Sequence, residues 1–338
     1  MSVEQGSLTT DGTTSLGPAP TAVTAESHPT GPDRPVAKKN TWRRALKKDW
    51  RLYSFLVLPI VFLLIFRYVP MAGNVIAFRR FRPGGNIFGE EWVGLHYVRM
   101  LVNDAKFWEV FQNTIILGAL TLLICFPLPI VLALLLNEVR IRWFKRLVQT
   151  VSYLPHFMSI VIVATLVFQI FSVQGTINQV LDVVGAGPVN FLQDASWFRT
   201  IYISSEVWQT VGWGTILYLA ALTTIDDQLY EAARIDGANR LKQTWHVTLV
   251  GIMPTMVTLL VLNIGTFLAV GFEKVLLLYN PLTYPTADVI ATYVYRIGIQ
   301  SSNFSYATAV GLFESIIGLT LVLAANAISK RVVGTSLW

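Results

Sequence analysis

NTIILGALTLLICFPLPIVLALLLN, residues 113–137, carries no charged side chain over its whole length. A helix of about 20 mostly apolar residues crosses the hydrocarbon core of a bilayer, so this run is long enough to span it. Its apolar residues follow one another without the alternation of a half-buried strand, which favours a helix. Because backbone groups in lipid must be bonded within the segment, the run predicts a membrane-spanning α-helix.

The composition extends this prediction to the whole chain. Of the 338 residues, 53% are hydrophobic and only 14% are charged, and the mean hydropathy is +0.53. A soluble domain carries roughly 25% charged residues, because water must wet its surface. We therefore predict an all-α, polytopic membrane protein. Six apolar segments are long enough to span, at residues 52–70, 113–137, 151–173, 198–224, 252–272 and 306–328.

The N-terminal part of the chain has a different character. Residues 1–37 are rich in Ser, Thr, Pro, Gly and Ala, and such a segment is expected to be disordered because it has little to bury. A basic segment follows at 38–51 and leads into the first span. The apolar run is too long for a signal peptide and lacks an obvious cleavage site, so we expect a retained span within a membrane domain over 52–332.

Basic residues predict the orientation in the membrane. If the N-terminus is cytoplasmic, the inside segments hold 16 Lys and Arg residues and the outside loops 71–112, 174–197 and 273–305 hold seven. Lys and Arg are enriched in cytoplasmic loops, so both termini are expected to be cytoplasmic. The net charge of +6 is thereby explained by topology, and nucleic acid is not an expected partner.

The loop between the fourth and fifth segments, 225–251, contains DDQLYEAARIDGAN at residues 226–239. Asp226 or Asp227 can cap a helix by accepting bonds from free backbone N–H groups. Gly237 can adopt the left-handed conformation that ends a helix. Ala232 and Ala233 let another surface approach closely. The loop is therefore expected to form a short helix at the membrane surface.

This loop closely resembles the Glu-Ala-Ala loop of ABC importer permeases. The resemblance implies a type I permease fold and a coupling helix that docks into a separate ATPase subunit. The implied coupling residues are Glu231, Ala232, Ala233, Asp236 and Gly237. It also implies a second, similar permease, two ATPase subunits and an extracytoplasmic solute-binding protein as partners. The sequence departs from the family pattern at Val250, where proline is expected.

Three further stretches resemble the carbohydrate branch of the family, namely the permeases of polysaccharides and oligosaccharides of the aldouronate type. They are residues 153–156, 271–280 and 288–298, and the resemblance covers roughly residues 45–332. It implies that the chain helps to carry a carbohydrate, an oligosaccharide, across the cytoplasmic membrane. A permease for a non-sugar solute is the alternative within the family.

Motifs of enzymes are missing from the sequence. There is no Gly-Lys pair, hence no phosphate-binding loop, and the chain is expected to leave ATP hydrolysis to a partner. Its four histidines lack metal-ligand spacing, so neither a metal nor a cofactor is expected. An ion-coupled secondary transporter would show inverted repeats, which are not evident. A membrane scaffold without a substrate path is the third alternative.

Polar side chains within the predicted spans suggest a substrate path. Ionisable groups in spans are costly and usually face the bundle interior or a water-filled cavity. Sugar hydroxyls need donors and acceptors, and aromatic rings can stack on the apolar faces of sugars. The alternative is that these groups only form hydrogen bonds that hold the helices together. The candidates are Glu206, Asn263 and Glu314 as polar groups, with Trp208, Trp213 and Tyr218 as stacking surfaces.

Overall fold

The computed structural model describes residues 50–332, so the predicted disordered tail and nearly all of the basic segment lie outside the described residues. The chain divides into two units, one ending at Val61 and the other beginning at Phe62. In the first unit the described residues belong to α2 (Trp50–Leu63), which buries none of its side chains. This helix continues as η1 (Leu64–Tyr68) and α3 (Val69–Met71).

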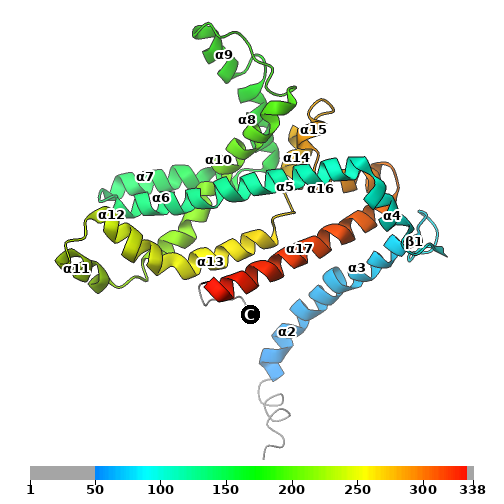
Figure 1. The fold of residues 1–338 in the computed structure, drawn as a ribbon, viewed down its shortest axis with the longest axis horizontal. Coiled ribbons are helices and arrows are strands. Elements are labelled where there is room, and N and C mark those ends of the chain that lie inside the picture. The colour runs from blue at the N-terminus through cyan, green and yellow to red at the C-terminus, as the bar shows by residue number, and fades with distance from the viewer. Residues whose placement is uncertain (1–49, 333–338) are drawn as a thin grey trace, which may run out of the picture. The chain divides into compact units, whose positions relative to one another are not determined.

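The second unit is helical apart from one short hairpin (Figure 1). Its elements are η2 (Ala72–Phe78), β1 (Arg79–Arg80), β2 (Glu91–Trp92), α4 (His96–Asn103), α5 (Ala105–Cys125), α6 (Pro127–Glu138), α7 (Arg142–Tyr153), η3 (Leu154–Phe157), α8 (Ile160–Phe171), α9 (Thr176–Val183), α10 (Ala195–Leu222), α11 (Asp227–Ile235), α12 (Arg240–Gln243), η4 (Thr244–Thr248), α13 (Leu249–Gly265), α14 (Phe272–Leu278), α15 (Tyr284–Ala287), α16 (Ile290–Tyr295), η5 (Arg296–Gln300) and α17 (Phe304–Val332). The antiparallel hairpin pairs Arg79 with Trp92 and Arg80 with Glu91.

Five helical stretches among the described residues are long and apolar enough to cross a membrane. They are Trp50–Phe78, Ala105–Glu138, Ile160–Val183, Arg240–Gly265 and Phe304–Arg331. The sixth segment predicted from the sequence, 198–224, forms α10, which has 28 residues but is less apolar than these five. The prediction of a mostly helical membrane protein is confirmed, and five of the described helices meet the criterion on their own.

Two predicted segments have different boundaries in the structure. The segment 151–173 does not start as one helix, because η3 with Pro155 separates α7 from α8, which begins at Ile160. Pro155 lies in the first turn of η3, where its missing N–H costs no helical bond, and the chain leaves the helix at Met158, which is extended, before Ser159 caps α8. The segment 252–272 ends its helix early, at Gly265, and residues 266–271 run as turns and irregular backbone. That irregular stretch forms part of the candidate site below.

The helix α10 lies at the centre of the second unit and packs against α5, α6, α7 and α13. One hydrophobic cluster joins Phe198 and Tyr202 of α10 to Leu117 of α5 and Val275 of α14. The backbones of α10 and α7 touch at Gly212, where an added Cβ would lie 2.0 Å from the carbonyl oxygen of Ser152. Only glycine fits there, so α7 is held directly on α10 although it buries no side chain of its own.

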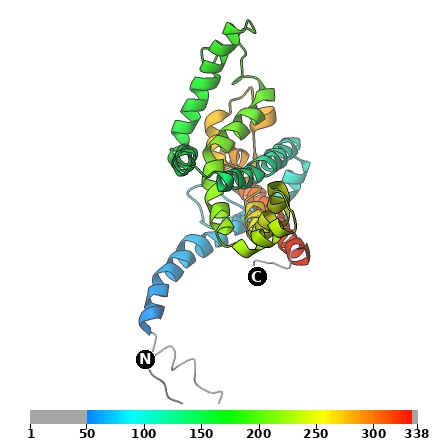
Figure 2. The same ribbon diagram turned by 90° about the vertical axis from the view of Figure 1, so that its left-hand side faces the viewer.

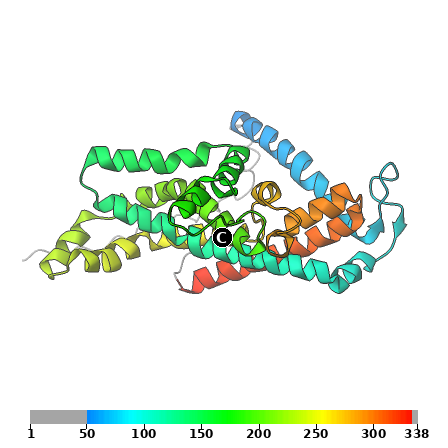
Figure 3. The same ribbon diagram turned by 90° about the horizontal axis from the view of Figure 1, so that it is seen from above.

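The two ends of the second unit carry different elements. The helices α8 and α9 follow one another in nearly one line (Figure 2). The helix α11 lies at one end of the unit, and the hairpin β1–β2 lies at the opposite end (Figures 1 and 3). The long helices α5–α6 and α17 run between these two ends (Figure 1). If those helices span the membrane, α11 and the hairpin face opposite sides of it.

Candidate coupling helix and substrate path

The short helix α11 has the local structure that the sequence predicts. The side chain of Asp226 caps it by accepting a hydrogen bond of 2.9 Å from the backbone N–H of Gln228. Gly237 follows it with φ +75°, a left-handed conformation that favours glycine. The N–H groups of Gly237 and Ala238 donate to the carbonyls of Arg234 and Ala233, which closes the end of the helix.

The surface of α11 is open. None of its side chains is buried, and the apolar Leu229 and Ile235 are 53% and 87% exposed. Its anchor to the rest of the unit is a hydrogen bond of 3.0 Å between the hydroxyls of Tyr230 and Thr248. Exposed apolar residues on a short, capped helix are typical of a surface that binds another protein.

The departure at Val250 has a simple structural meaning. The chain passes through this position as an unbroken helix, Arg240–Gly265, and Val250 is half exposed on it. A proline lies four residues further on, at Pro254, inside α13. A proline at position 250 would remove one backbone hydrogen bond of the helix. Here Pro254 removes such a bond instead, because it has no N–H to donate to the carbonyl of Val250, so the lost bond lies one helical turn further along.

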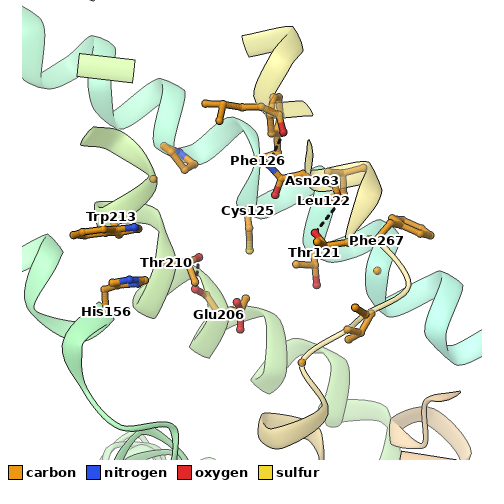
Figure 4. A pocket seen from close by; sticks show the side chains of 18 of the residues that line it. Thr121, Leu122, Cys125, Phe126, His156, Glu206, Thr210, Trp213, Asn263 and Phe267 are labelled. Atoms are coloured by element: carbon orange, nitrogen blue, oxygen red, sulfur yellow. Dashed lines mark hydrogen bonds between the residues drawn. The ribbon is translucent and has the colours of Figure 1, made fainter. Parts of the chain in front are cut away.

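A cavity of about 480 Å³ lies between α5, α10 and α13, and the irregular residues 266–271 close one side of it (Figure 4). Its volume falls in the range of small-molecule sites, roughly 300–1,000 Å³. Non-helical backbone at membrane depth is tolerated where it lines a cavity, which fits the early end of α13. Gly118 of α5 permits the close approach, since a Cβ there would lie 2.7 Å from the carbonyl oxygen of Phe267.

One wall of the cavity is aromatic. The rings of Trp213 and His156 stack with centroids 4.5 Å apart and an interplanar angle of 4°. Phe157 meets Trp213 edge to face at 5.4 Å. Asn263 lies across the cavity from this wall, and Glu206 and Thr210 lie between them on α10 (Figure 4). Trp213 keeps 44% of its surface exposed, so it offers area to a ligand.

Glu206 forms an ion pair with a buried lysine that does not line the cavity. The ammonium of Lys274, on α14, donates to one carboxylate oxygen of Glu206 at 2.5 Å. Lys274 is only 2% exposed, whereas the Glu206 side chain is 21% exposed. Sequence reasoning found Glu206 but missed Lys274. Its signal was a lone cation in the apolar run FEKVLLL, residues 272–278, where a buried charge needs a partner.

The structure brings together some predicted path residues and separates others. Glu206, Trp213, Asn263 and Tyr218 all line the same cavity. Trp208 does not line it and is 47% exposed elsewhere on α10. Glu314 lines a different cavity, of about 640 Å³, formed with η5, α16 and α17. The three polar groups that the sequence suggests for a substrate path are thus divided between two cavities.

A hydrogen-bond network joins the helices at the end that carries the hairpin. Asp104 caps α5 and accepts a hydrogen bond of 2.6 Å from the hydroxyl of Tyr306 and another from that of Tyr293. Burial raises the pKa of Asp104, but these hydroxyls and two backbone N–H groups outweigh it and hold the pKa below its ordinary value. Nearby, Arg296 pairs with the fully buried Asp288. The network fixes this end of α5, α16 and α17.

These features define a class of protein, the membrane subunit of a transporter with an exposed helix for a partner. The sequence profile of the binding-protein-dependent transport system inner membrane components matches residues 125–334, and the chain belongs to this family. It is 46% identical to the polygalacturonan/rhamnogalacturonan transport system permease protein YteP of Bacillus subtilis (strain 168), over 91% of this chain and 97% of YteP. It is 44% identical to Protein LplB of the same organism, over 90% of this chain and 98% of LplB.

A solved structure with the same fold is a bacterial ABC transporter involved in the import of the acidic polysaccharide alginate. One of its chains is 44% identical and matches with a TM-score of 0.81, covering 86% of this chain and 99% of that one. The same transporter in complex with an alginate pentasaccharide-bound periplasmic protein matches with a TM-score of 0.82. The prediction of a sugar-importing ABC permease, a multi-pass protein of the inner membrane, is confirmed. Family membership decides against an ion-coupled transporter and a scaffold.

Proposed function

We propose that this chain, as one permease of an ABC importer, carries an oligosaccharide with carboxylate groups into the cell. The observation that carries the proposal is the cavity on α10, whose polar and aromatic groups suit a sugar. Glu206, Thr210 and Asn263 offer hydrogen-bonding groups, and Trp213 with His156 offers an aromatic surface. The acidic class of saccharide is taken from the substrates in the names of YteP and of the alginate transporter.

The proposed subunit works with three kinds of partner. A second, similar permease completes the path, two ATPase subunits hydrolyse ATP, and an extracytoplasmic binding protein delivers the sugar. The residues of this chain that contact the ATPase are Glu231, Ala232, Ala233, Asp236 and Gly237 on and after α11. Closure of the ATPases on ATP moves this helix and switches the paired permeases from inward-facing to outward-facing.

Reconstitution tests the proposed function directly. The complete importer in liposomes, with its binding protein, is expected to accumulate a labelled galacturonate trimer only when ATP is supplied. Uptake is expected to stop when either the ATPase or the binding protein is left out. A glucose trisaccharide, which differs from the galacturonate trimer in its sugar units and linkages as well as in charge, serves as the neutral control and is expected to be taken up poorly. Uptake of the neutral sugar alone would reject the substrate class, and uptake of neither would reject the function.

The proposed topology has six spans, with α10 as the fourth and both termini in the cytoplasm. The position of α11 at the opposite end from the hairpin supports it, because the coupling helix must meet a cytoplasmic ATPase. The basic residues Arg142, Lys145 and Arg146 at the start of α7 also support a cytoplasmic loop before that helix.

Reporter fusions test this topology. Fusions at Arg142 and Lys242 are expected to report the cytoplasm, and a fusion at Val189, between α9 and α10, is expected to report the exterior. The measurement is the activity of a reporter that works in only one compartment, paired with one that works only in the other. A cytoplasmic signal at Val189 would overturn the proposed orientation, and together with a cytoplasmic signal at Lys242 it would mean that α10 does not span.

A further inference from the structure

The charge balance of the cavity on α10 is unusual. Among the described residues that line it, Glu206 is the one Asp, Glu, Lys or Arg side chain. A lone carboxylate in a poorly hydrated cavity would repel an anionic saccharide, because charges interact more strongly where the effective dielectric constant is low. A cavity that admits uronates must therefore compensate this charge.

Lys274 supplies the compensation without entering the cavity. Its ammonium contacts one oxygen of Glu206 and lies 5.8 Å from the centre of the Tyr202 ring. The side chain is 2% exposed and belongs to the same short helix as the buried Val275 and Leu278. It is absent from the cavity wall, so a ligand meets the carboxylate and not the ammonium.

The second oxygen of Glu206 remains available. Within the described part of the chain no group donates a hydrogen bond to it, and it is not among the buried side-chain atoms that lack a partner. It is therefore accessible and can accept a hydrogen bond from a sugar hydroxyl. Paired with Lys274, the carboxylate acts as a neutralised acceptor rather than as a free negative charge.

We infer that Lys274 is a buried counter-ion that makes the cavity permissive for acidic saccharides by neutralising Glu206. Lys274 is a positioning residue, since it acts through Glu206 and does not touch the substrate. The inference rests on the proposed function and adds to it the group that decides whether a uronate is tolerated. A saccharide whose carboxylates are esterified should be nearly indifferent to this group.

The test compares two substrates in the complete reconstituted importer, a galacturonate trimer and its fully methyl-esterified, neutral form. Lys274→Met leaves Glu206 uncompensated and is expected to raise KM for the acidic trimer at least about tenfold, since truncating one partner of a buried charge pair is costly. KM for the ester is expected to change by less than about threefold. The double variant Glu206→Gln with Lys274→Met carries no charge to compensate, and is expected to recover transport of the acidic trimer.

A matched control is Lys106→Met, which breaks an exposed Lys–Glu pair with Glu109 away from the cavity and is expected to change neither KM. Co-purification of the ATPase with each variant verifies that the importer assembles. Equal losses for both substrates that the double variant does not restore would make Lys274 purely structural and overturn the inference. Failure of the wild-type importer to carry either substrate rejects the proposed function and the inference together.

Discussion

Replacement of Gly237 by valine is expected to abolish sugar uptake while leaving the permease inserted in the membrane. Gly237 has φ +75°, and an added Cβ would meet no atom within 4 Å, so the obstacle is the backbone and not space. The left-handed conformation costs a residue with a Cβ about 1–2 kcal/mol, and the turn after α11 rearranges to avoid it. That rearrangement shifts the proposed contact with the ATPase. The measurements are uptake and the amount of ATPase that co-purifies, both expected to fall at least about tenfold.

Gly185 offers a matched control for this substitution. It also has φ +75° with no atom within 4 Å of an added Cβ, and it lies just after α9, on the expected extracytoplasmic side. Gly185→Val introduces the same backbone strain away from α11, and near wild-type uptake is expected. Equal losses in both variants would indicate a general folding defect. Full uptake and full ATPase retention in Gly237→Val would mean that the loop at α11 is only a solvated turn.

The second large effect is expected for Trp213→Ala. The indole forms the aromatic wall of the cavity with His156, and its removal takes away both the stacking surface and the partner of that ring. Truncation of a tryptophan at the centre of a binding site typically costs about 2 kcal/mol or more, which corresponds to a rise in KM of more than about tenfold. The measurement is the concentration dependence of uptake of a galacturonate trimer by the reconstituted importer.

Trp208 on the same helix is the control. It is 47% exposed against 44% for Trp213, but it does not line the cavity. Trp208→Ala removes an equal amount of aromatic surface from α10 and is expected to leave KM unchanged. If the two alanine variants behaved alike, the cavity on α10 would not be the path of the sugar.

Local features of this protein could be predicted from its sequence because local chemistry sets them. Long apolar runs indicated the spanning helices. A cap at Asp226 or Asp227 and a left-handed Gly237 were predicted from residue type and spacing, and the structure has the cap at Asp226. The break between α7 and α8 comes at Met158, three residues after Pro155, and the apolar character of the surrounding sequence concealed it. No proline marks the early end of α13 at Gly265. The irregular backbone after it lines the cavity, which only the three-dimensional structure reveals.

Tertiary features could not be predicted in the same way. Lys274 and Glu206 are 68 residues apart, and no periodicity relates a residue on α14 to one on α10. The position of Glu314 along its helix did not show which cavity it faces, because residues at the same depth in a membrane can face different cavities. Helix rotation decides which cavity a side chain faces, and packing against neighbouring helices sets that rotation.

The hydrogen bond between Tyr230 and Thr248 connects α11 to the helix that lines the cavity. Thr248 lies on the continuous helix Arg240–Gly265, which reaches Asn263 in the cavity wall, about 22 Å further along at 1.5 Å per residue. If α11 is the coupling helix, a displacement that the ATPase imposes on it would be carried along this helix to the cavity. Pro254 lies between Thr248 and Asn263 and removes one backbone hydrogen bond, so this is the point at which the helix bends most easily.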